Sequence, residues 1–358
     1  MSRNPRTAET DYAPGKMNYR QAKEKAAAKG RKIKAIILAV VLFVAAGLCI
    51  FSAFYPASTW KYYVGLPDVP KRKEGELRIH FLDVGQGDCT LVEFPDGRTM
   101  MIDGGDGKAE HTKTILRYMN ALKIDALDFL LLTHSDSDHC GGLSEIMEIK
   151  EVKTVYLPEI KDININREYA EFYASVAESD ARIIYSERYL GIFSEGEYPY
   201  SLVFLSPYRA GNPGGSPYDK VNGGDYTEND LNDTSAVVWL DYFGTSALFC
   251  GDATSRIEET LIRDAELNFF EDYGVTLDST EILKVSHHGS ATGTGEEFVR
   301  YLGLETAVIS CGENNSYGHP DAGVCERLSE AGAEIYRTDL SGTIMISVFP
   351  DGTYSATI

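Results

Sequence analysis

One short stretch constrains the fold of this sequence more than any other, because an apolar run passes directly into a cluster of potential metal ligands. The stretch reads LLLTHSDSDHCGGL and contains His134, Asp136, Asp138 and His139. The apolar run is typical of a buried strand, and the glycine pair that begins at Gly141 admits a helix. Alternation along an extended loop turns the first two ligands to one side, and the helix re-aims the other two. One segment can therefore supply two adjacent metal positions.

Three further motifs place imidazole or carboxylate groups where predicted strands end. ILKVSHHGS puts His287 and His288 after an apolar run, so a third imidazole can reach a site built at strand ends. SALFCGDA puts Asp252 in a similar place, where it either bridges two cations or serves as a turn residue. NNSYGHP supplies His319 in a loop, where it either contacts substrate or packs the loop. The other two histidines are predicted to be structural or surface residues: His80 and His111.

An apolar segment fixes how the chain relates to a membrane. Residues 35–55 carry no charge and form a run of about twenty residues, the length that a helix needs to cross the hydrocarbon of a bilayer. A long basic stretch precedes this run and few cations follow it. The positive-inside rule therefore predicts a single-pass protein of the cell membrane, with a cytoplasmic N-terminus and an extracellular body. A cleaved signal peptide is the alternative, although both the apolar run and the basic leader are long for one.

The sequence predicts four parts: a basic cytoplasmic tail (1–34), a transmembrane helix (35–55), a linker (56–76) and one body (77–358). Strands are predicted in the body at 77–84, 89–94, 99–102, 127–132, 152–157, 182–185, 201–205, 235–243, 246–249, 281–285, 306–310, 334–336 and 343–348. Helices are predicted at 111–122, 141–149, 167–178, 255–270, 296–302 and 322–331. This mixture predicts a layered α/β body. Residues 209–232 are long for a connection and are either a flap over a site or a surface insertion.

Charge and cysteine content exclude several classes of protein. The formal net charge is −20, but residues 1–34 hold ten Lys or Arg against three acidic residues, so the rest of the chain carries −27. Such a body cannot rely on general attraction to phosphate backbones, which disfavours a nucleic-acid-coating role and still allows a nuclease with a local site. The six cysteines form no CxxC pair, so zinc-ribbon and thioredoxin-like sites have no support. A disulfide between Cys311 and Cys325 is compatible with an extracellular body.

The motifs together resemble those of the metallo-β-lactamase superfamily, and specifically the extracytoplasmic hydrolase domain of ComEC-type competence proteins. The resemblance runs in order through HFLDVGQGDCTLVEF, MMIDGG, LLTHSDSDHCGGL, NDTSAVVWL, FCGDA, LKVSHHGS and YGHP. It implies a four-layer αββα sandwich with a metal site at one edge, preceded here by one N-terminal transmembrane helix. It does not extend to the multi-span channel of the competence proteins.

The resemblance also implies a set of metal ligands. These are His134 and Asp136 for one ion, Asp138, His139 and His287 for the other, and Asp252 as the bridge. The position of Asp136 is usually His in the superfamily, and this chain has no histidine between His139 and His287. Asp233 is the candidate for the missing neighbourhood, as a ligand or a substrate-side group. A set this rich in oxygen predicts two divalent metal ions, Mn²⁺ or Zn²⁺.

Catalytic and supporting roles follow from the same resemblance. Asp138 is expected to act in catalysis as well as to bind metal. His288 and His319 are expected either to orient a phosphoryl oxygen or protonate the leaving alkoxide, or to hold other groups in place. The residues expected near the substrate or behind the ligands are Asp233, Ser290, Asp83, Asp88 and Asp103.

These inferences predict a membrane-anchored extracellular phosphodiesterase, foremost a DNase for DNA uptake or nucleic-acid scavenging that works with a separate channel protein. Contact with DNA would be confined to the metals and a few local cations, such as Lys284, Arg209 or Lys220. One alternative is a cell-wall or teichoic-acid phosphodiesterase, such as a phosphocholine esterase, with an aromatic cage from residues 209–232. The other is a non-catalytic anchored interaction module, against which the intact ligand set argues.

Overall fold

The structure is a computed structural model that describes residues 19–212 and 215–358. The chain divides into two units, Met1–Trp60 and Lys61–Ile358. The first half of the predicted basic tail, residues 1–18, lies outside the described residues.

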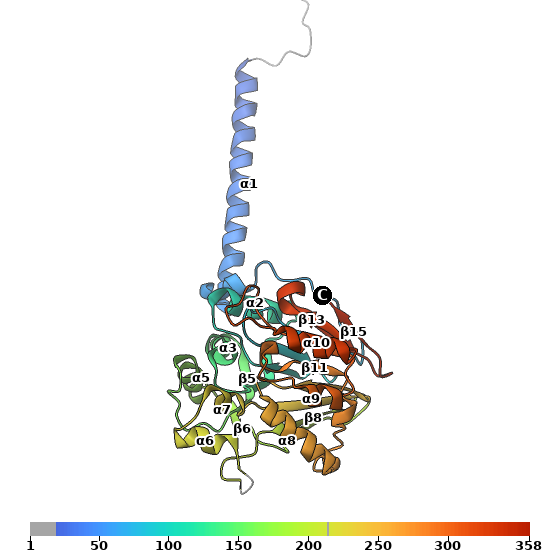
Figure 1. The fold of residues 1–358 in the computed structure, drawn as a ribbon. Helices are drawn as coiled ribbons and strands as arrows, with labels where there is room; N and C mark the ends of the chain where they lie inside the picture. The colour runs from blue at the N-terminus through green and yellow to red at the C-terminus, as the bar shows by residue number, and fades with distance from the viewer. Residues whose placement is uncertain (1–18, 213–214) are drawn as a thin grey trace, which may run out of the picture. The chain divides into compact units, whose positions relative to one another are not determined.

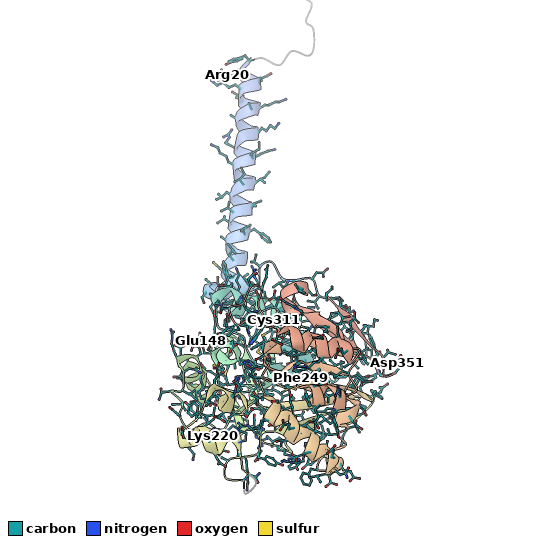
Figure 2. All side chains as sticks on the ribbon, in the orientation of Figure 1. Arg20, Glu148, Lys220, Phe249, Cys311 and Asp351 are labelled. Carbon is teal, nitrogen blue, oxygen red and sulfur yellow. The ribbon has the colours of Figure 1, made fainter. Side chains whose placement is uncertain are left out.

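The first unit is dominated by one long helix, α1 (Tyr19–Phe54), whose side chains project outward along its length (Figures 1 and 2). The helix is long and apolar enough to cross a membrane, with a mean hydropathy of 2.9 in its most apolar window and none of that window buried. It begins well before the predicted span, because residues 20–29 are rich in Ala and Lys, which favour helix. A short 3₁₀ helix, η1 (Ala57–Tyr62), follows it.

The second unit contains two sheets built from the predicted strands and from two further strands, Gly191–Phe193 and Tyr354–Thr357 (Figure 1). The first sheet has the order β15-β14-β1-β2-β3-β4-β5-β6, and the second has the order β13-β12-β11-β10-β9-β8-β7. The strands of the first sheet are β1 (Leu77–Phe81), β2 (Thr90–Glu93), β3 (Thr99–Ile102), β4 (Ala126–Leu131), β5 (Glu151–Leu157), β6 (Arg182–Tyr185), β14 (Ile344–Val348) and β15 (Tyr354–Thr357). Those of the second are β7 (Gly191–Phe193), β8 (Tyr200–Ser206), β9 (Val237–Tyr242), β10 (Thr245–Phe249), β11 (Ile282–Lys284), β12 (Thr306–Ile309) and β13 (Glu334–Arg337).

Helices flank both sheets, so the predicted four-layer αββα architecture is confirmed. In Figure 1, α5, α6 and α7 lie on one flank of this unit and α8, α9 and α10 lie on the other. The helices are α2 (Ala109–Ala121), α3 (Ser137–Cys140), α4 (Leu143–Ile149), α5 (Arg167–Glu178), α6 (Pro217–Gly223), α7 (Glu228–Asn232), α8 (Ser255–Glu266), α9 (Glu296–Tyr301), α10 (Ala322–Glu330) and α11 (Thr338–Ser341). Three short 3₁₀ helices complete the unit: η2 (Glu271–Tyr273), η3 (Leu277–Ser279) and η4 (Ser286–Gly289).

Strand alternation explains how the layers are held together. In β8, Leu202 and Phe204 enter the apolar core between the two sheets, whereas Val203 and Leu205 enter the core beneath the helices of the second sheet. Successive side chains of a strand point to opposite faces, so a strand that is apolar at every position must be covered on both sides. A third core joins the first sheet to α2, α4 and α5.

The sheet topology brings several strand ends to one edge. Strands β3, β4, β5 and β6 are parallel neighbours, as are β10, β11, β12 and β13. The residues that follow the carboxyl ends of parallel strands gather at the same edge of a sheet, which is where ligand sites of α/β proteins form. The predicted metal ligands follow β4, β10 and β11.

Two segments differ from what the sequence predicts. The second half of the predicted linker packs on the body: Tyr62 is buried in a core, and its carbonyl accepts a hydrogen bond from Asn120. Residues 209–232 contain α6 and α7 and pack on the same core through Tyr218, Val221 and Leu231.

All six cysteines are free thiols, so the Cys311–Cys325 disulfide is absent.

Candidate metal centre

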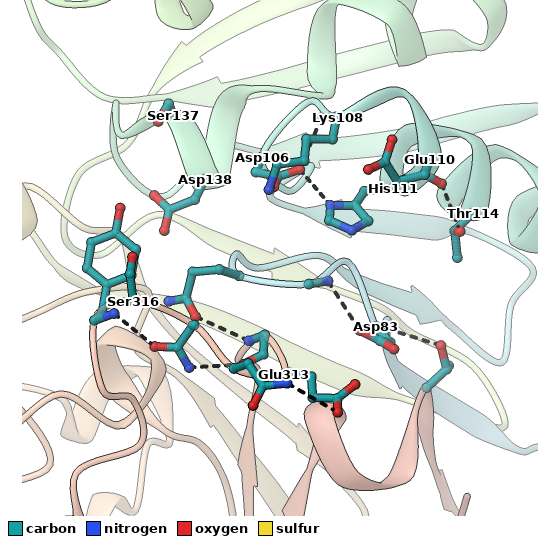
Figure 3. Close-up of a pocket in the computed structure, with 17 residues that line it drawn as sticks. Asp83, Asp106, Lys108, Glu110, His111, Thr114, Ser137, Asp138, Glu313 and Ser316 are labelled. Atoms are coloured by element: carbon teal, nitrogen blue, oxygen red, sulfur yellow. Dashed lines mark hydrogen bonds and ion pairs between the residues drawn. The ribbon is translucent and has the colours of Figure 1, made fainter.

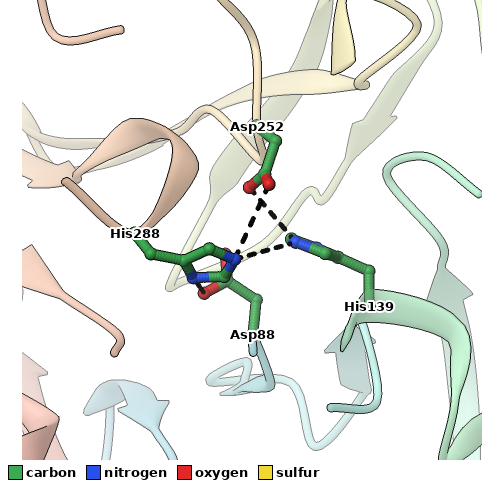
Figure 4. Close-up of side chains that lie close together, drawn as sticks. All are labelled: Asp88, His139, Asp252 and His288. Carbon is green, nitrogen blue, oxygen red and sulfur yellow. Dashed lines mark hydrogen bonds and ion pairs between the residues drawn. The ribbon is translucent and has the colours of Figure 1, made fainter. Parts of the chain in front are cut away.

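Four histidine side chains meet at Asp252, which follows β10. The Nε2 atoms lie 3.1 Å (His139), 3.6 Å (His288), 3.7 Å (His287) and 3.9 Å (His134) from its carboxylate oxygens. Figure 4 shows Asp252 between His139 and His288, with Asp88 beneath them. The four residues of that figure each offer a ligand atom within 4.8 Å of the others. A carboxylate with two oxygens inside a ring of imidazoles is suited to bridge two cations.

The other nitrogen of each of these imidazoles is held from behind. The Nδ1 atoms lie near Asp103 Oδ2 (2.8 Å, His139), the Ser310 carbonyl (2.9 Å, His288), Thr292 Oγ1 (2.8 Å, His287) and Thr133 Oγ1 (3.1 Å, His134). Such hydrogen bonds at Nδ1 fix the ring orientation and present Nε2 as the ligand atom. Asp103 was expected behind the ligands, and its carboxylate lies behind His139, at the Nδ1 side of the ring.

Two carboxylates complete the cluster. Asp138 Oδ2 lies 3.2 Å from His288 Nε2, and Asp136 Oδ2 lies 3.5 Å from His134 Nε2. Asp138, His288 and His139 are therefore neighbours, as are His134 and Asp136, and Asp252 lies beside all the imidazoles.

The spacing of these donors fits divalent cations. A tetrahedrally coordinated metal ion lies about 2 Å from each ligand atom, so two of its ligand atoms are about 3.3 Å from each other. The Nε2 atoms of His139 and His288 are 3.3 Å apart. His134 Nε2 is buried without a hydrogen-bond partner among the described residues. Buried polar atoms rarely stay unpaired, so the donor set fits a metal that would occupy them.

The two consecutive histidines are separated by an unusual backbone. His287 and His288 both have positive φ, 48° and 53°, which is rare for residues other than glycine. With this backbone both rings reach Asp252 Oδ2, at 3.7 Å (His287) and 3.6 Å (His288). His288, rather than His287, lies beside Asp138 and His139. This differs from the sequence prediction, which assigned His287 to that position; the spacing of adjacent residues along the chain cannot reveal such a backbone.

Burial and neighbouring charges oppose each other in the cluster. Burial lowers the pKa of His139, but the Asp252 and Asp103 carboxylates outweigh it and hold this pKa well above its usual range. The same balance, with Asp252 and Asp88 as neighbours, raises the pKa of His288 to about 10. Burial would raise the pKa of Asp138, yet the adjacent His288 and His139 lower it to about 2. The carboxylates thus stabilise positive charge at the imidazoles. A metal cation bound to the imidazoles in place of their protons would be stabilised in the same way.

Asp88 joins this site to a buried lysine. Its Oδ2 lies 2.6 Å from Lys284 Nζ, and its Oδ1 lies 3.3 Å from His288 Nδ1. Lys284 is only 2% exposed, so the prediction that it contacts DNA is wrong. Burial raises the pKa of Asp88, but Lys284 and His288 hold it well below its usual range. Asp88 therefore lies behind His288, on the Nδ1 side of the ring.

Three residues expected near the substrate lie outside the cluster. Asp233 accepts hydrogen bonds from Thr254 and pairs with Arg256 at the start of α8. Ser290 accepts hydrogen bonds from Thr292, which in turn holds His287. Asp83 accepts a hydrogen bond from the Gly85 amide and lines the neighbouring cavity.

His319 lies against the histidines of the centre. Its ring centroid is 5.4 Å from that of His287 and 6.2 Å from that of His288. Its Nδ1 is buried and makes no hydrogen bond to the described residues. Burial, followed by the charges of His287 and His288, lowers its pKa. His319 therefore places its imidazole at the edge of the donor set.

An open polar cavity of about 900 Å³ adjoins the centre at Asp138 (Figure 3). Its walls come from residues 83–86, 106–114, 137–138 and 312–317, with Thr343. His111 lies in this cavity, where its Nδ1 contacts Asp106 Oδ1 at 2.7 Å, and Lys108 pairs with the same carboxylate at 2.6 Å. His111 was predicted to be a structural or surface residue and Asp106 was not predicted at the site, because neither belongs to a ligand motif. Only the fold brings His111 and Asp106 to a cavity that adjoins the metal centre. His80, by contrast, is buried between Tyr118 and Glu93, as a structural histidine.

Two packed sheets with helices on both outer faces, and a His/Asp cluster at one sheet edge, define an αββα protein with a candidate metal centre. The chain belongs to the metallo-beta-lactamase superfamily, whose sequence profile matches residues 82–313. Members of this superfamily are mostly metal-dependent hydrolases.

The chain is also similar to competence proteins. It is 29% identical over 287 residues to ComE operon protein 3 of Bacillus subtilis, which covers 76% of this chain and 33% of that protein. It is 29% identical over 275 residues to competence protein ComA of Neisseria gonorrhoeae, covering 77% and 33%. The chain thus spans about a third of the length of these relatives. Among solved structures, CmlA, a diiron beta-hydroxylase from Streptomyces venezuelae, has a TM-score of 0.47 at 15% identity, covering 78% of this chain and 55% of that one.

Proposed function

We propose that the chain is a metal-dependent phosphodiesterase that cleaves nucleic acid, foremost DNA. The observation that carries this proposal is the convergence of four imidazole Nε2 atoms on Asp252, within 3.9 Å. The similarity to competence proteins supports DNA as the substrate class, in uptake or scavenging.

The donor set would hold two divalent cations, Mn²⁺ or Zn²⁺. Asp138, His139 and His288 would bind one ion and His134, Asp136 and His287 the other, with Asp252 between them. His287 thereby takes the place for which the sequence offered Asp233. Two such ions supply an acidified water and an electrophilic partner for the phosphoryl oxygen. Imidazole and carboxylate donors suit both metals.

His319 is proposed to orient the substrate. Its ring borders His287 and His288, and the cavity opens beside them at Asp138. An imidazole N–H there can donate a hydrogen bond to a phosphoryl or leaving-group oxygen. Replacement by alanine is expected to lower kcat by about 10²- to 10⁴-fold, the usual worth of a proton-handling side chain. Unchanged kcat in steady-state assays of this variant would assign His319 to loop packing.

The proposal includes anchoring in the cell membrane through α1. The helix has an 18-residue apolar window of mean hydropathy 2.9, and basic residues precede it in the chain. The positive-inside rule then puts the N-terminus in the cytoplasm and the second unit outside. A separate DNA-uptake channel protein is the partner that this placement implies.

The phosphocholine alternative has less support from the structure. Of the two aromatic residues in 209–232, Tyr218 is fully buried, with its hydroxyl on the Ser186 carbonyl, and Tyr226 is partly buried against the core. Tyr208, just before this segment, is hydrogen-bonded to Asp264.

The direct test is hydrolysis by the full chain, purified in detergent, freed of metal and given Mn²⁺ or Zn²⁺. Single-stranded DNA and bis-p-nitrophenyl phosphate are the substrates, and Asp138→Asn is compared with a matched change at exposed Asp351, D351N. We expect metal-dependent cleavage of both substrates by the wild type and D351N, and none by D138N. Hydrolysis of the small diester without DNA cleavage would exclude the nuclease function, and no hydrolysis of either would exclude the phosphodiesterase.

A further inference from the structure

The wall of the cavity next to the metal centre is a loop fixed in place by one asparagine. Asn315 Nδ2 donates to the carbonyls of Gly312 (2.9 Å) and His319 (2.6 Å). Its Oδ1 accepts from the amides of Tyr317 (3.2 Å) and His319 (3.0 Å). Four hydrogen bonds from one side chain hold residues 312–319 in a defined shape, so the loop is organised before a ligand arrives.

This loop presents an aromatic ring to solvent at the cavity. Tyr317 is 68% exposed and lines the cavity together with Asp138. Its ring lies 5.7 Å from that of His319 at an interplanar angle of 24°, and His319 lies over His288 at the same angle. Three nearly parallel rings therefore lead from solvent to the donor set. A planar ligand group placed on the free face of Tyr317 would extend this stack.

The charges of the cavity limit how a polyanion can bind there. Its walls carry five carboxylates, and its one lysine, Lys108, is paired with Asp106. Ionic attraction to a phosphate backbone is therefore weak, and affinity must come from the metals and from uncharged contacts. Stacking of a base on an aromatic side chain supplies such a contact, worth about 5- to 150-fold in affinity per base.

We propose that Tyr317 is a stacking platform for an unpaired nucleobase adjacent to the phosphodiester held at the metal centre. This inference rests on the proposed nuclease function and deepens it. In a duplex both faces of an internal base are covered by its neighbours, so a platform of this kind selects single-stranded segments and strand ends. Because every base has a planar face, the platform is tolerant of sequence.

The test compares three substrates on the full chain loaded with Mn²⁺ in detergent. They are a single-stranded deoxyoligonucleotide, an oligomer of the same length without bases, and bis-p-nitrophenyl phosphate. The variants are Tyr317→Ala, Tyr317→Phe and, as a matched control, Phe193→Ala, an exposed aromatic on β7 outside the cavity. For each, kcat/KM on the two oligomers is divided by kcat/KM on the small diester.

We expect Y317A to lower this ratio for the base-bearing oligomer by about 5- to 150-fold, mainly through KM, and to leave the ratio for the abasic oligomer unchanged. Y317F and F193A should keep the wild-type preference. Equal losses on both oligomers, or no loss, would overturn the stacking role while leaving the nuclease function standing. A wild type that hydrolyses the small diester and neither oligomer would refute the nuclease function, and the stacking proposal with it.

Discussion

Asp103 shows how much a single side chain behind the ligands contributes. Its carboxylate accepts hydrogen bonds from the Thr133 amide and hydroxyl and contacts His139 Nδ1, each at 2.8 Å. Asp103 thereby links the end of β3 to the loop after β4 and fixes the ring of a proposed ligand. Its own φ of 60° indicates that the backbone is strained to place it there.

The variant Asp103→Asn is expected to weaken metal binding by about 10- to 100-fold, as changes behind a ligand usually do. Activity should return at higher metal concentration, because the ligands themselves remain. Calorimetric titration of the metal-free full chain with Mn²⁺ measures the affinity, with D351N as the control. Wild-type affinity in D103N would show that His139 does not depend on this carboxylate.

The residue scale also shows what the sequence could and could not predict. The motifs predicted five residues to be neighbours, because each follows a strand whose end lies at the same edge. These are His134, Asp136, Asp138, His139 and Asp252. The sequence could not reveal that His288, rather than the predicted His287, lies beside Asp138, since this placement depends on two consecutive positive φ angles. It could not single out Tyr317, whose closeness to Asp138 depends on how two distant loops fold together.

At the scale of elements, Glu258 joins α8 to the loop before α9. Its carboxylate is 2% exposed and accepts hydrogen bonds from the amides of Thr294 and Gly295. Burial raises the pKa of Glu258 to about 7, although these two amides oppose the shift. A carboxyl with a raised pKa in the folded state stabilises the fold below its unfolded pKa. That contribution is lost as pH rises through the folded pKa.

We therefore expect the wild type to lose up to about 3 kcal/mol of stability between pH 4.5 and 7.5 relative to Glu258→Gln, whose side chain does not titrate. Thermal unfolding of both full chains across this pH range measures the difference. Exposed Glu259, the next residue of α8, supplies the control E259Q, which should follow the wild type. Parallel pH curves for wild type and E258Q would contradict the assignment.

Elements differed in how far the sequence could predict them. The strands β8 and β9 were predicted because their continuous apolar runs, LVFL and VVWL, indicate burial on both faces. The helices α6 and α7 within residues 209–232 were not predicted. Each is about two turns or less, and packing on a distant core stabilises it rather than a periodic apolar pattern of its own.

On the scale of the whole molecule, charge and hydropathy separate the two units. The chain carries −20 overall, while residues 1–34, which precede the apolar stretch of α1, hold ten Lys or Arg against three acidic residues. An acidic body combined with a basic, apolar N-terminal segment matches an anchored enzyme whose own surface does not adhere to phosphate-rich polymers.

The proposed topology makes a prediction for cells that express the full chain with an epitope tag before residue 1. Protease added outside should digest the second unit, and the tag should stay protected until the membrane is opened. Immunoblots for the tag and the body report both outcomes. A tag that is digested while the body survives would reverse the orientation, and a chain in the soluble fraction would exclude the anchor.

The central claim is that Asp252 lies between two divalent cations, and the number of metal ions bound per chain tests it most directly. The full chain, reconstituted with Mn²⁺ or Zn²⁺ and dialysed, is analysed by elemental mass spectrometry beside Asp252→Asn and D351N. We predict about two ions per chain for the wild type and D351N, and a marked loss in D252N, because its amide cannot bridge two cations. Wild-type chain without bound metal, or D252N with the full complement, would contradict the account.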